Sequence, residues 1–174
     1  HTQQAKGYFQ KVIDTRDDLS LKARASAYAN LGFCYFVEEE PEQAADLLQR
    51  AEKLQLELDQ EDSNNLGIIA LWNARIQIDL GDYLRAVGFF NKALELAGRQ
   101  PDYKMMAEVH SELAALYAET GDYETAYAYL IDRDEYLEAH RANEDRRQQQ
   151  ELEIRYQAAR KQQEAELLEL KATQ

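Results

Sequence analysis

Four alanines recur along the chain at a nearly constant spacing, and this recurrence restricts the fold more than any other feature. Ala5, Ala44, Ala86 and Ala126 are 39, 42 and 40 residues apart, and a bulky apolar residue follows each alanine four positions later. Residues four apart lie on one face of a helix, so each pair places a small side chain beside a large one. A period of this length is typical of helical repeat arrays, in which each helix pair buries its apolar face against its neighbours.

A short glycine motif stands before two of these alanines and predicts a corner between two helices. Residues 81–83 and residues 121–123 both have the sequence Gly-Asp-Tyr. Glycine adopts the left-handed conformation that commonly ends a helix, and aspartate caps the N-terminus of the helix that follows. The chain is therefore expected to fold as successive helix–corner–helix units.

The helix before the alanine carries a second motif, which is clearest in Tyr28-x2-Leu31-Gly32-x2-Tyr35. We call each alanine, together with the bulky apolar residue four positions later, the alanine phrase. The two motifs together resemble the tetratricopeptide repeat (TPR), whose signature is W-x2-L-G-x2-Y followed by A-x3-F and a later proline. Here tyrosine replaces the tryptophan, and the terminal proline is absent apart from a displaced Pro101. The period is near 40 rather than about 34, which implies longer helices. Repeats of the HEAT type share the longer period but do not explain the two Gly-Asp-Tyr corners.

The resemblance implies an all-α fold, namely a TPR-like right-handed superhelix of antiparallel helix pairs that ends in a long C-terminal helix. The second unit is the weakest match, because Asn73-Ala74 and Gln77 replace the leucine, glycine and tyrosine of its first helix. The expected division is a repeat array at 2–140, with a half unit at 2–16 and full units at about 25–58, 67–100 and 107–140, and an extended charged helix at 141–174.

The charge of the chain lies in the repeats. The formal net charge is −13, and residues 141–174 contribute seven basic and seven acidic residues, so the preceding part carries 13 basic against 26 acidic residues. Such a surface repels phosphate backbones, which excludes nucleic acid as an expected partner. A basic peptide would suit it, although an acidic solvated surface also serves solubility alone. No apolar run approaches the roughly 20 residues that span a bilayer.

The chain shows no constellation of residues typical of an enzyme, and we expect no cofactor and no metal site within it. It contains neither a phosphate-binding loop nor a dinucleotide-binding glycine pattern. His110 takes a bulky first-helix position and is expected in the core, and Cys34 is expected as a small buried apolar residue. Residues 38–40, all glutamate, stand at a helix corner and are interpreted as a solvated turn.

A TPR array presents a concave groove lined by its first helices, and the resemblance places a partner-binding groove on this chain. The expected occupant is an apolar or amphipathic protein or peptide segment. The lysines with which some TPR proteins clamp a carboxylate are missing from the matching positions. The alternative is that the missing half of the first repeat, or the C-terminal tail of the chain, covers Phe33, Phe36 and Val37. The lining positions are Ala29, Phe33, Phe36, Val37, Leu71, Arg75 and Ile78, continued by Asp79, Ser111, Ala115 and Glu119.

The C-terminal segment is predicted to be a long helix, because neither glycine nor proline occurs after Gly121. Ile154, Ala158, Ala165 and Leu168 follow heptad spacing, which predicts a thin helix-pairing seam and a homodimer. The alternative is a solvated capping helix on the last repeat. The sequence leaves open whether the helix bends near Asn143, where Asn-Glu-Asp weakens helix propensity.

Residues 152–169 resemble the helix that follows TPR arrays in bacterial membrane-anchored sensors of the diguanylate cyclase or histidine kinase type. This resemblance implies a sensor or input domain that relays partner binding through its C-terminal helix, located in the periplasm. The alternative is a standalone adaptor or scaffold in the cytoplasm. The chain starts with His1 in mid-repeat, so we expect it to be part of a longer protein.

Overall fold

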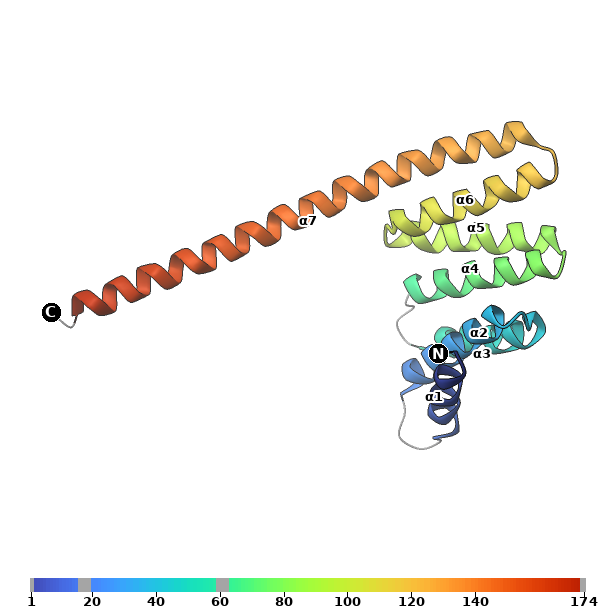
Figure 1. The fold of residues 1–174 in the computed structure, drawn as a ribbon, viewed down its shortest axis with the longest axis horizontal. Helices are drawn as coiled ribbons and strands as arrows, with labels where there is room; N and C mark the ends of the chain where they lie inside the picture. The colour runs from blue at the N-terminus through green and yellow to red at the C-terminus, as the bar shows by residue number, and fades with distance from the viewer. Residues whose placement is uncertain (1, 16–19, 59–62, 173–174) are drawn as a thin grey trace.

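The computed structural model describes residues 2–15, 20–58 and 63–172, and the regular structure of these residues is helical throughout. The all-α prediction is confirmed. The helices, drawn in Figure 1, are α1 (Thr2–Asp14), α2 (Leu21–Val37), α3 (Pro41–Leu56), α4 (Ser63–Asp79), α5 (Tyr83–Arg99), α6 (Tyr103–Glu119) and α7 (Tyr123–Ala172).

The helices form three antiparallel pairs that stack side by side, with α1 packed against α2 as a single helix at one end (Figure 1). The pairs are α2 with α3, α4 with α5, and α6 with the first part of α7. Their first helices begin 42 and 40 residues apart, which matches the period of the alanines. Of the predicted half unit at 2–16, α1 covers residues 2–14, and residue 16 lies outside the described residues, as do residues 1 and 173–174.

Short polar side chains start the helices where the sequence predicts them. The Asp82 carboxylate accepts a hydrogen bond from the backbone N–H of Arg85 at 3.1 Å, which caps α5. Asp122 caps α7 in the same way through Thr125, also at 3.1 Å. Each cap satisfies a backbone donor that a helix N-terminus leaves without a partner.

The residue before each capping aspartate reverses the chain. Gly81 and Gly121 have φ angles of 77° and 83°, in the left-handed region that glycine enters without steric cost. The first unit lacks this glycine, and Glu39 takes the left-handed conformation there with φ 61°. Its helix then begins at Pro41, whose fixed φ suits the first helical position. The same corner is thus built with two different sets of residues.

The alanine phrase forms the core. Ala44 and Ala86 are fully buried, together with Leu48 and Phe90 four residues later. A methyl group added at Gly32 would lie 3.1 Å from Leu48 Cγ, so a larger residue at this position would require the neighbouring side chain to shift. The phrase is less buried at the ends of the array, where its large members are only half-buried, because a helix there has a neighbour on one side only.

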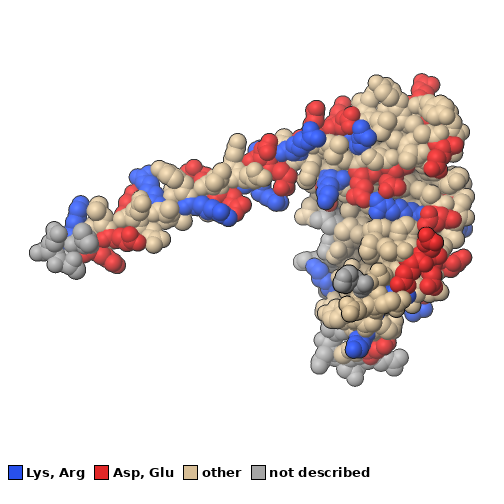
Figure 2. All heavy atoms as spheres, viewed as in Figure 1, with Lys and Arg blue, Asp and Glu red and all other residues tan. Residues whose placement is uncertain are grey.

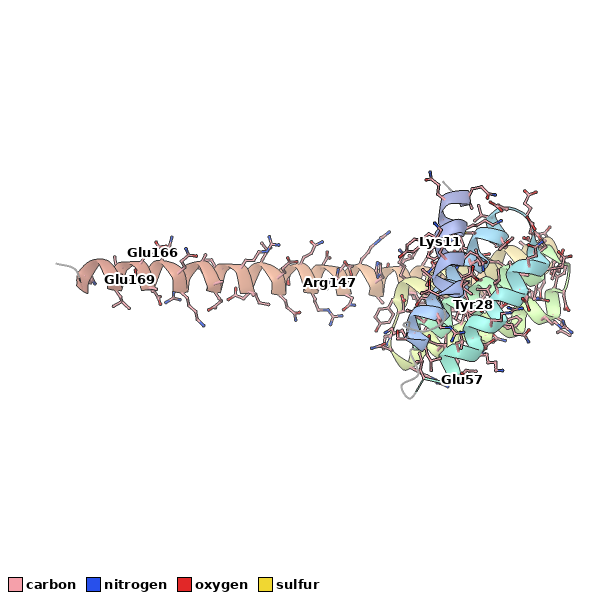
Figure 3. All side chains as sticks on the ribbon, turned by 90° about the horizontal axis from the view of Figure 1, so that it is seen from below. Lys11, Tyr28, Glu57, Arg147, Glu166 and Glu169 are labelled. Atoms are coloured by element: carbon pink, nitrogen blue, oxygen red, sulfur yellow. The ribbon has the colours of Figure 1, made fainter. Side chains whose placement is uncertain are left out.

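The first part of the last helix packs in the array, and the rest extends beyond the array into solvent. α7 runs as one 50-residue helix, so no break occurs near Asn143. Its first part packs on α6, whereas every described side chain from residue 145 onward is exposed. Figure 3 shows Arg147, Glu166 and Glu169 on the free part, with no other element beside them. Within the described ranges, no helix is both long enough and apolar enough to cross a membrane.

Candidate protein-binding site

A hollow of about 440 Å³ opens on the face formed by the first helices of the repeats. It lies near the C-terminal ends of α2 and α4, and α6 closes one side. The residues that line it are Phe33, Phe36, Val37, Trp72, Arg75, Ile78, Asp79 and Glu112.

Three aromatic rings form the floor of this hollow. Phe33 and Trp72 meet edge to face with ring centroids 4.5 Å apart, and Phe36 meets the same indole at 5.4 Å. Such geometry places the positive edge of one ring against the negative face of another. Phe33 remains 38% exposed and Val37 52% exposed, so apolar surface is left at the mouth of the hollow.

One arginine is fixed at the edge of the hollow by two carboxylates from the next repeat. The Arg75 guanidinium lies over the Trp72 ring at 4.6 Å and donates hydrogen bonds to Glu108 at 2.5 Å and to Glu112 at 2.8 Å. Burial alone would lower the pKa of Arg75, but the hydrogen bonds that its guanidinium donates to Glu108 and Glu112 raise the pKa above its ordinary value. The carboxylates of Glu108 and Glu112 therefore balance the positive charge of Arg75 within the protein.

The rim of the hollow is acidic. Asp79 and Glu112 line the hollow, and Glu108 and Glu112 pair with Arg75, which leaves a formal charge of −2 on these four residues. Figure 2 shows further acidic side chains gathered along the side of the repeat body where α2, α4 and α6 end. Residues 38–40 at the end of α2 belong to this side. The hollow therefore favours positively charged partners.

The structure brings together five of the seven predicted groove residues, namely Phe33, Phe36, Val37, Arg75 and Ile78. The prediction for Leu71 is wrong, because it is only 4% exposed and packs in the core cluster shared by α4, α5 and α6. Ala29 is half-buried against the neighbouring core cluster and does not line the hollow.

The groove prediction missed Trp72 and Glu112. Both stand one residue beyond the predicted positions 71 and 111, so at these two points the next side chain along the helix lines the hollow. The signal was present in the sequence, since Trp72 is the only tryptophan and precedes Arg75 by one helical turn.

His110 and Cys34, the other candidates from the sequence, are both buried in the packed helices. His110 is buried, with Nδ1 2.8 Å from the Met106 carbonyl oxygen and the ring against Tyr129 and Tyr136. Cys34 is 5% exposed, and burial raises the pKa of its thiol, so the nucleophilic thiolate is disfavoured. Across the described parts of the chain, no three His, Cys, Asp or Glu side chains are placed to hold a metal ion.

The predicted helix-pairing residues lie on the free part of α7. Ile154 and Leu168 are 68% and 67% exposed, and Ala158 and Ala165 are exposed as well. The single chain leaves this seam open to solvent, and its pairing remains a prediction.

Comparisons with known proteins agree with this architecture. Residues 74–99 match the sequence profile of the tetratricopeptide repeat family. No curated protein sequence matches the chain.

Several solved structures have a similar fold. The structure of MamA superposes with a TM-score of 0.61 at 19% identity, over 81% of this chain and 71% of that one. The TPR domain of Arabidopsis FLU gives 0.62 at 22% identity, over 69% of this chain and 99% of that one. BtubC (BKLC) from P. vanneervenii gives 0.62 at 18% identity, over 79% of this chain and 55% of that one.

These similarities establish the fold, and the sequence match identifies the repeat. Tetratricopeptide repeats are protein-interaction modules rather than enzymes, and they present concave surfaces to their partners. Residues 74–99 thus match the tetratricopeptide repeat by sequence, and the array as a whole has the fold of the solved structures named above.

Proposed function

We propose that this module binds a short segment of another protein in the hollow between α2, α4 and α6. An apolar side chain of that segment enters beside Phe33 and Trp72, and a basic side chain next to it lies against Asp79 and Glu112. The observation that carries this proposal is an exposed apolar floor of aromatic rings with a rim of net negative charge.

The energetics of the hollow suit such a segment. Phe33 and Val37 keep exposed apolar surface that a bound side chain would remove from water, at about 25 cal/mol for each Å² buried. The acidic rim draws a basic segment toward the hollow and speeds its association. The ion pairs of Arg75 with Glu108 and Glu112 hold the rim in place before binding.

The single tryptophan gives a direct test. Because Trp72 lies in the hollow and is the only tryptophan of the chain, its fluorescence reports occupancy of this site. Peptides would be selected from a random display library on the full chain, and each would then be titrated while Trp72 emission is recorded. We expect selected peptides to combine an apolar residue with lysine or arginine and to shift the emission.

A matched pair of variants makes the test specific. Phe33→Glu places a charge on the apolar floor and should weaken binding at least about tenfold, since a buried unpaired charge is costly. Leu84→Glu changes an 86% exposed leucine on α5, away from the hollow, and should leave binding unchanged. Peptides that bind the Phe33→Glu chain as tightly as the parent chain would place the binding site elsewhere.

We further propose that the module is the sensor or input part of a signalling protein and that α7 relays binding. Two observations support this proposal: α7 is one continuous helix from the last repeat into solvent, and its residues 152–169 resemble the helix of membrane-anchored sensors. A shift of α6 against α7 would move the free part of the helix as a lever.

The standalone adaptor is the competing function, and a distance measurement separates the two. Spin labels would be placed at Leu84→Cys on α5 and Gln157→Cys on the free helix, in a Cys34→Ala chain diluted with unlabelled protein. A relay predicts that a selected peptide changes the distance distribution between the labels. An unchanged distribution with full peptide occupancy would favour the adaptor.

For location, the resemblance of the tail supports the periplasm. A fusion of the parent protein to alkaline phosphatase, which is active only outside the cytoplasm, tests this proposal. An inactive fusion that is expressed at normal levels would instead place the module in the cytoplasm.

A further inference from the structure

We infer that α7 pairs with the α7 of a second copy in antiparallel orientation, through the helix face that points away from α6. This inference does not depend on the proposed function, because it involves none of the residues of the hollow. The face is defined by six exposed apolar residues, and we refer to it as the outer stripe: Tyr123, Tyr127, Ile131, Leu152, Tyr156 and Leu167.

The outer stripe is unpartnered apolar surface in two stretches of the helix, residues 123–131 and 152–167, with Asp134, Glu138 and Asp145 on the same face between them. Its members are between 46% and 73% exposed. Tyr123, Tyr127 and Ile131 succeed one another at steps of four residues and are exposed, whereas the neighbouring Ala126 is buried. In an array, the next repeat would cover this side of the last helix.

The free part of α7 continues the same face. At 3.6 residues per turn, residues 18 apart lie about five turns apart on the same side of a helix. Leu152 and Tyr156 are therefore in line with Asp134 and Glu138, which follow Ile131 on the exposed side. One face thus runs from the last repeat to the end of the helix.

The predicted seam lies on the other side of the helix. By the same rule, Ile154 is in line with Tyr136, whose ring lies 5.0 Å from the His110 ring of α6. A second helix that packed along the seam of the first α7 would therefore collide with the repeats of the first chain near residue 140. A helix on the outer stripe meets no such obstacle, because α6 lies on the opposite side.

Charge decides the orientation. On the side of the outer stripe, Asp134 and Glu138 are acidic, whereas Arg160 is basic. A parallel pair would place each of these residues against its own copy, which is repulsive. An antiparallel pair centred near Arg147 places Asp134 of each copy against Arg160 of the other.

The same register makes one apolar pair in each half. With the two-fold axis near Arg147, Tyr127 lies opposite Leu167 of the second copy, whereas Ile131 lies opposite Gln163, Leu152 opposite Ala142 and Tyr156 opposite Glu138. Asp134 then lies opposite Arg160, whose guanidinium is exposed and holds only an intrahelical pair with Glu164. Exposed i,i+4 pairs contribute about 0.3–0.5 kcal/mol, so Arg160 can exchange this partner at little cost.

Cross-linking tests the orientation directly. In a full-length Cys34→Ala chain, Ile131→Cys and Gln163→Cys would be made as separate variants and treated with a short bismaleimide. Antiparallel pairing predicts that neither variant cross-links alone and that their mixture forms a covalent dimer. It also predicts a dimer by light scattering of the parent chain.

Three results would overturn the inference. A covalent dimer of Ile154→Cys alone would show parallel pairing through the seam. An intrachain cross-link in a chain that carries both Ile131→Cys and Gln163→Cys would show that the tail folds back on its own repeat. A parent chain that remains a monomer at concentrations of about 100 μM would show that the stripe does not pair tightly enough to matter.

A charge exchange tests the register with a matched control. Arg160→Glu should weaken dimerisation roughly tenfold, because it sets like charges opposite each other in both halves of the pair. Adding Asp134→Arg to the same chain should restore the dimer. Lys161→Glu makes the same charge change one residue away, on the side of the helix that faces the seam, and should have little effect. If Lys161→Glu weakens the dimer and Arg160→Glu does not, the seam is the interface.

Discussion

Phe33 of α2 and Trp72 of α4 meet edge to face with their ring centroids 4.5 Å apart, and this contact joins the first helices of two successive repeats. The same two rings form the floor of the hollow. Packing between repeats and partner binding therefore depend on shared side chains, so the hollow is held in shape by the stacking of the array.

This contact predicts a measurable coupling in stability. Trp72→Ala should lower the free energy of unfolding by about 1–3 kcal/mol, because the indole is partly buried between α2 and α4. Phe33→Ala should cost less, since its ring is more exposed. The double variant should cost less than the sum of the two, with a coupling of about 0.5–1.5 kcal/mol from the ring contact. Urea denaturation followed by circular dichroism measures all three. Strict additivity would mean that the ring contact contributes nothing to stability.

Two helical glycines should respond oppositely to alanine. Gly32→Ala should destabilise the chain by about 1–3 kcal/mol, because the new methyl would lie 3.1 Å from Leu48 Cγ and 3.3 Å from the Ala44 carbonyl oxygen. Gly88→Ala meets no atom within 4 Å and should stabilise α5 by about 0.5–1 kcal/mol through helix propensity. The free energies of unfolding of both variants give the answer. Stabilisation by Gly32→Ala would show that α2 and α3 can move apart without cost.

The corner after α2 carries avoidable backbone strain. Glu39 has φ 61°, whereas the matching corners use Gly81 and Gly121. Glu39→Gly should therefore stabilise the chain by about 0.5–1 kcal/mol, the difference between removed strain and added freedom of the unfolded chain. Thermal unfolding of this variant checks the prediction.

Gly121→Ala is the reverse control for the corner. Its methyl would meet no atom within 4 Å, so any loss of stability comes from the backbone alone. We expect a loss of about 1 kcal/mol. A Glu39→Gly chain less stable than the parent would show that the Glu39 side chain contributes more than its strained backbone costs.

The cap of α7 predicts a pH dependence. The Thr125 hydroxyl donates a hydrogen bond to Asp122 at 2.7 Å and the Thr125 backbone N–H donates another at 3.1 Å, and both lower the pKa of this carboxyl. A carboxyl whose pKa is lower in the folded state stabilises the fold above its unfolded-state pKa, and this contribution is lost as the pH falls through the folded-state value.

A single substitution isolates this contribution. Asp122→Ala should lower the melting temperature at neutral pH, and the difference from the parent chain should shrink as the pH falls below about 4. Asp122→Asn keeps a capping oxygen but cannot ionise, so its difference from the parent should also narrow in acid. A difference that stays constant down to about pH 2 would assign the effect to something other than the charge of Asp122.

The repeats could be predicted from local residues because each unit is built by contacts within about 40 residues. Gly81, Asp82 and the alanine phrase specify a corner and a tightly packed helix pair without reference to the rest of the chain. Glu39 shows the limit of this reasoning, since the same corner forms there without its characteristic glycine. Packing of α2 on α3 imposes the turn where local preference does not supply it.

The candidate site was predicted less completely, because a groove depends on the rotation of each helix about its own axis. A difference of one residue turns a side chain by about 100°. Leu71 and Trp72 are neighbours in sequence, yet the first is buried in the core of the array and the second lies in the hollow. The aromatic partners of Trp72 come from another repeat, and Glu112 comes from a third helix.

The sequence by itself determined that this chain is an all-α array of helix pairs, with its acidic charge in the repeats and a long polar helix at its end. Periodicity, helix caps and composition depend on residues that are close together in sequence, so they can be recognised from the sequence alone. Only the tertiary structure decided that Trp72 rather than Leu71 faces the hollow, that Arg75 is held by Glu108 and Glu112, and that α7 continues unbroken with one apolar face free. These features depend on how helices distant in sequence rotate and approach one another, and that is fixed by the packing of the whole array.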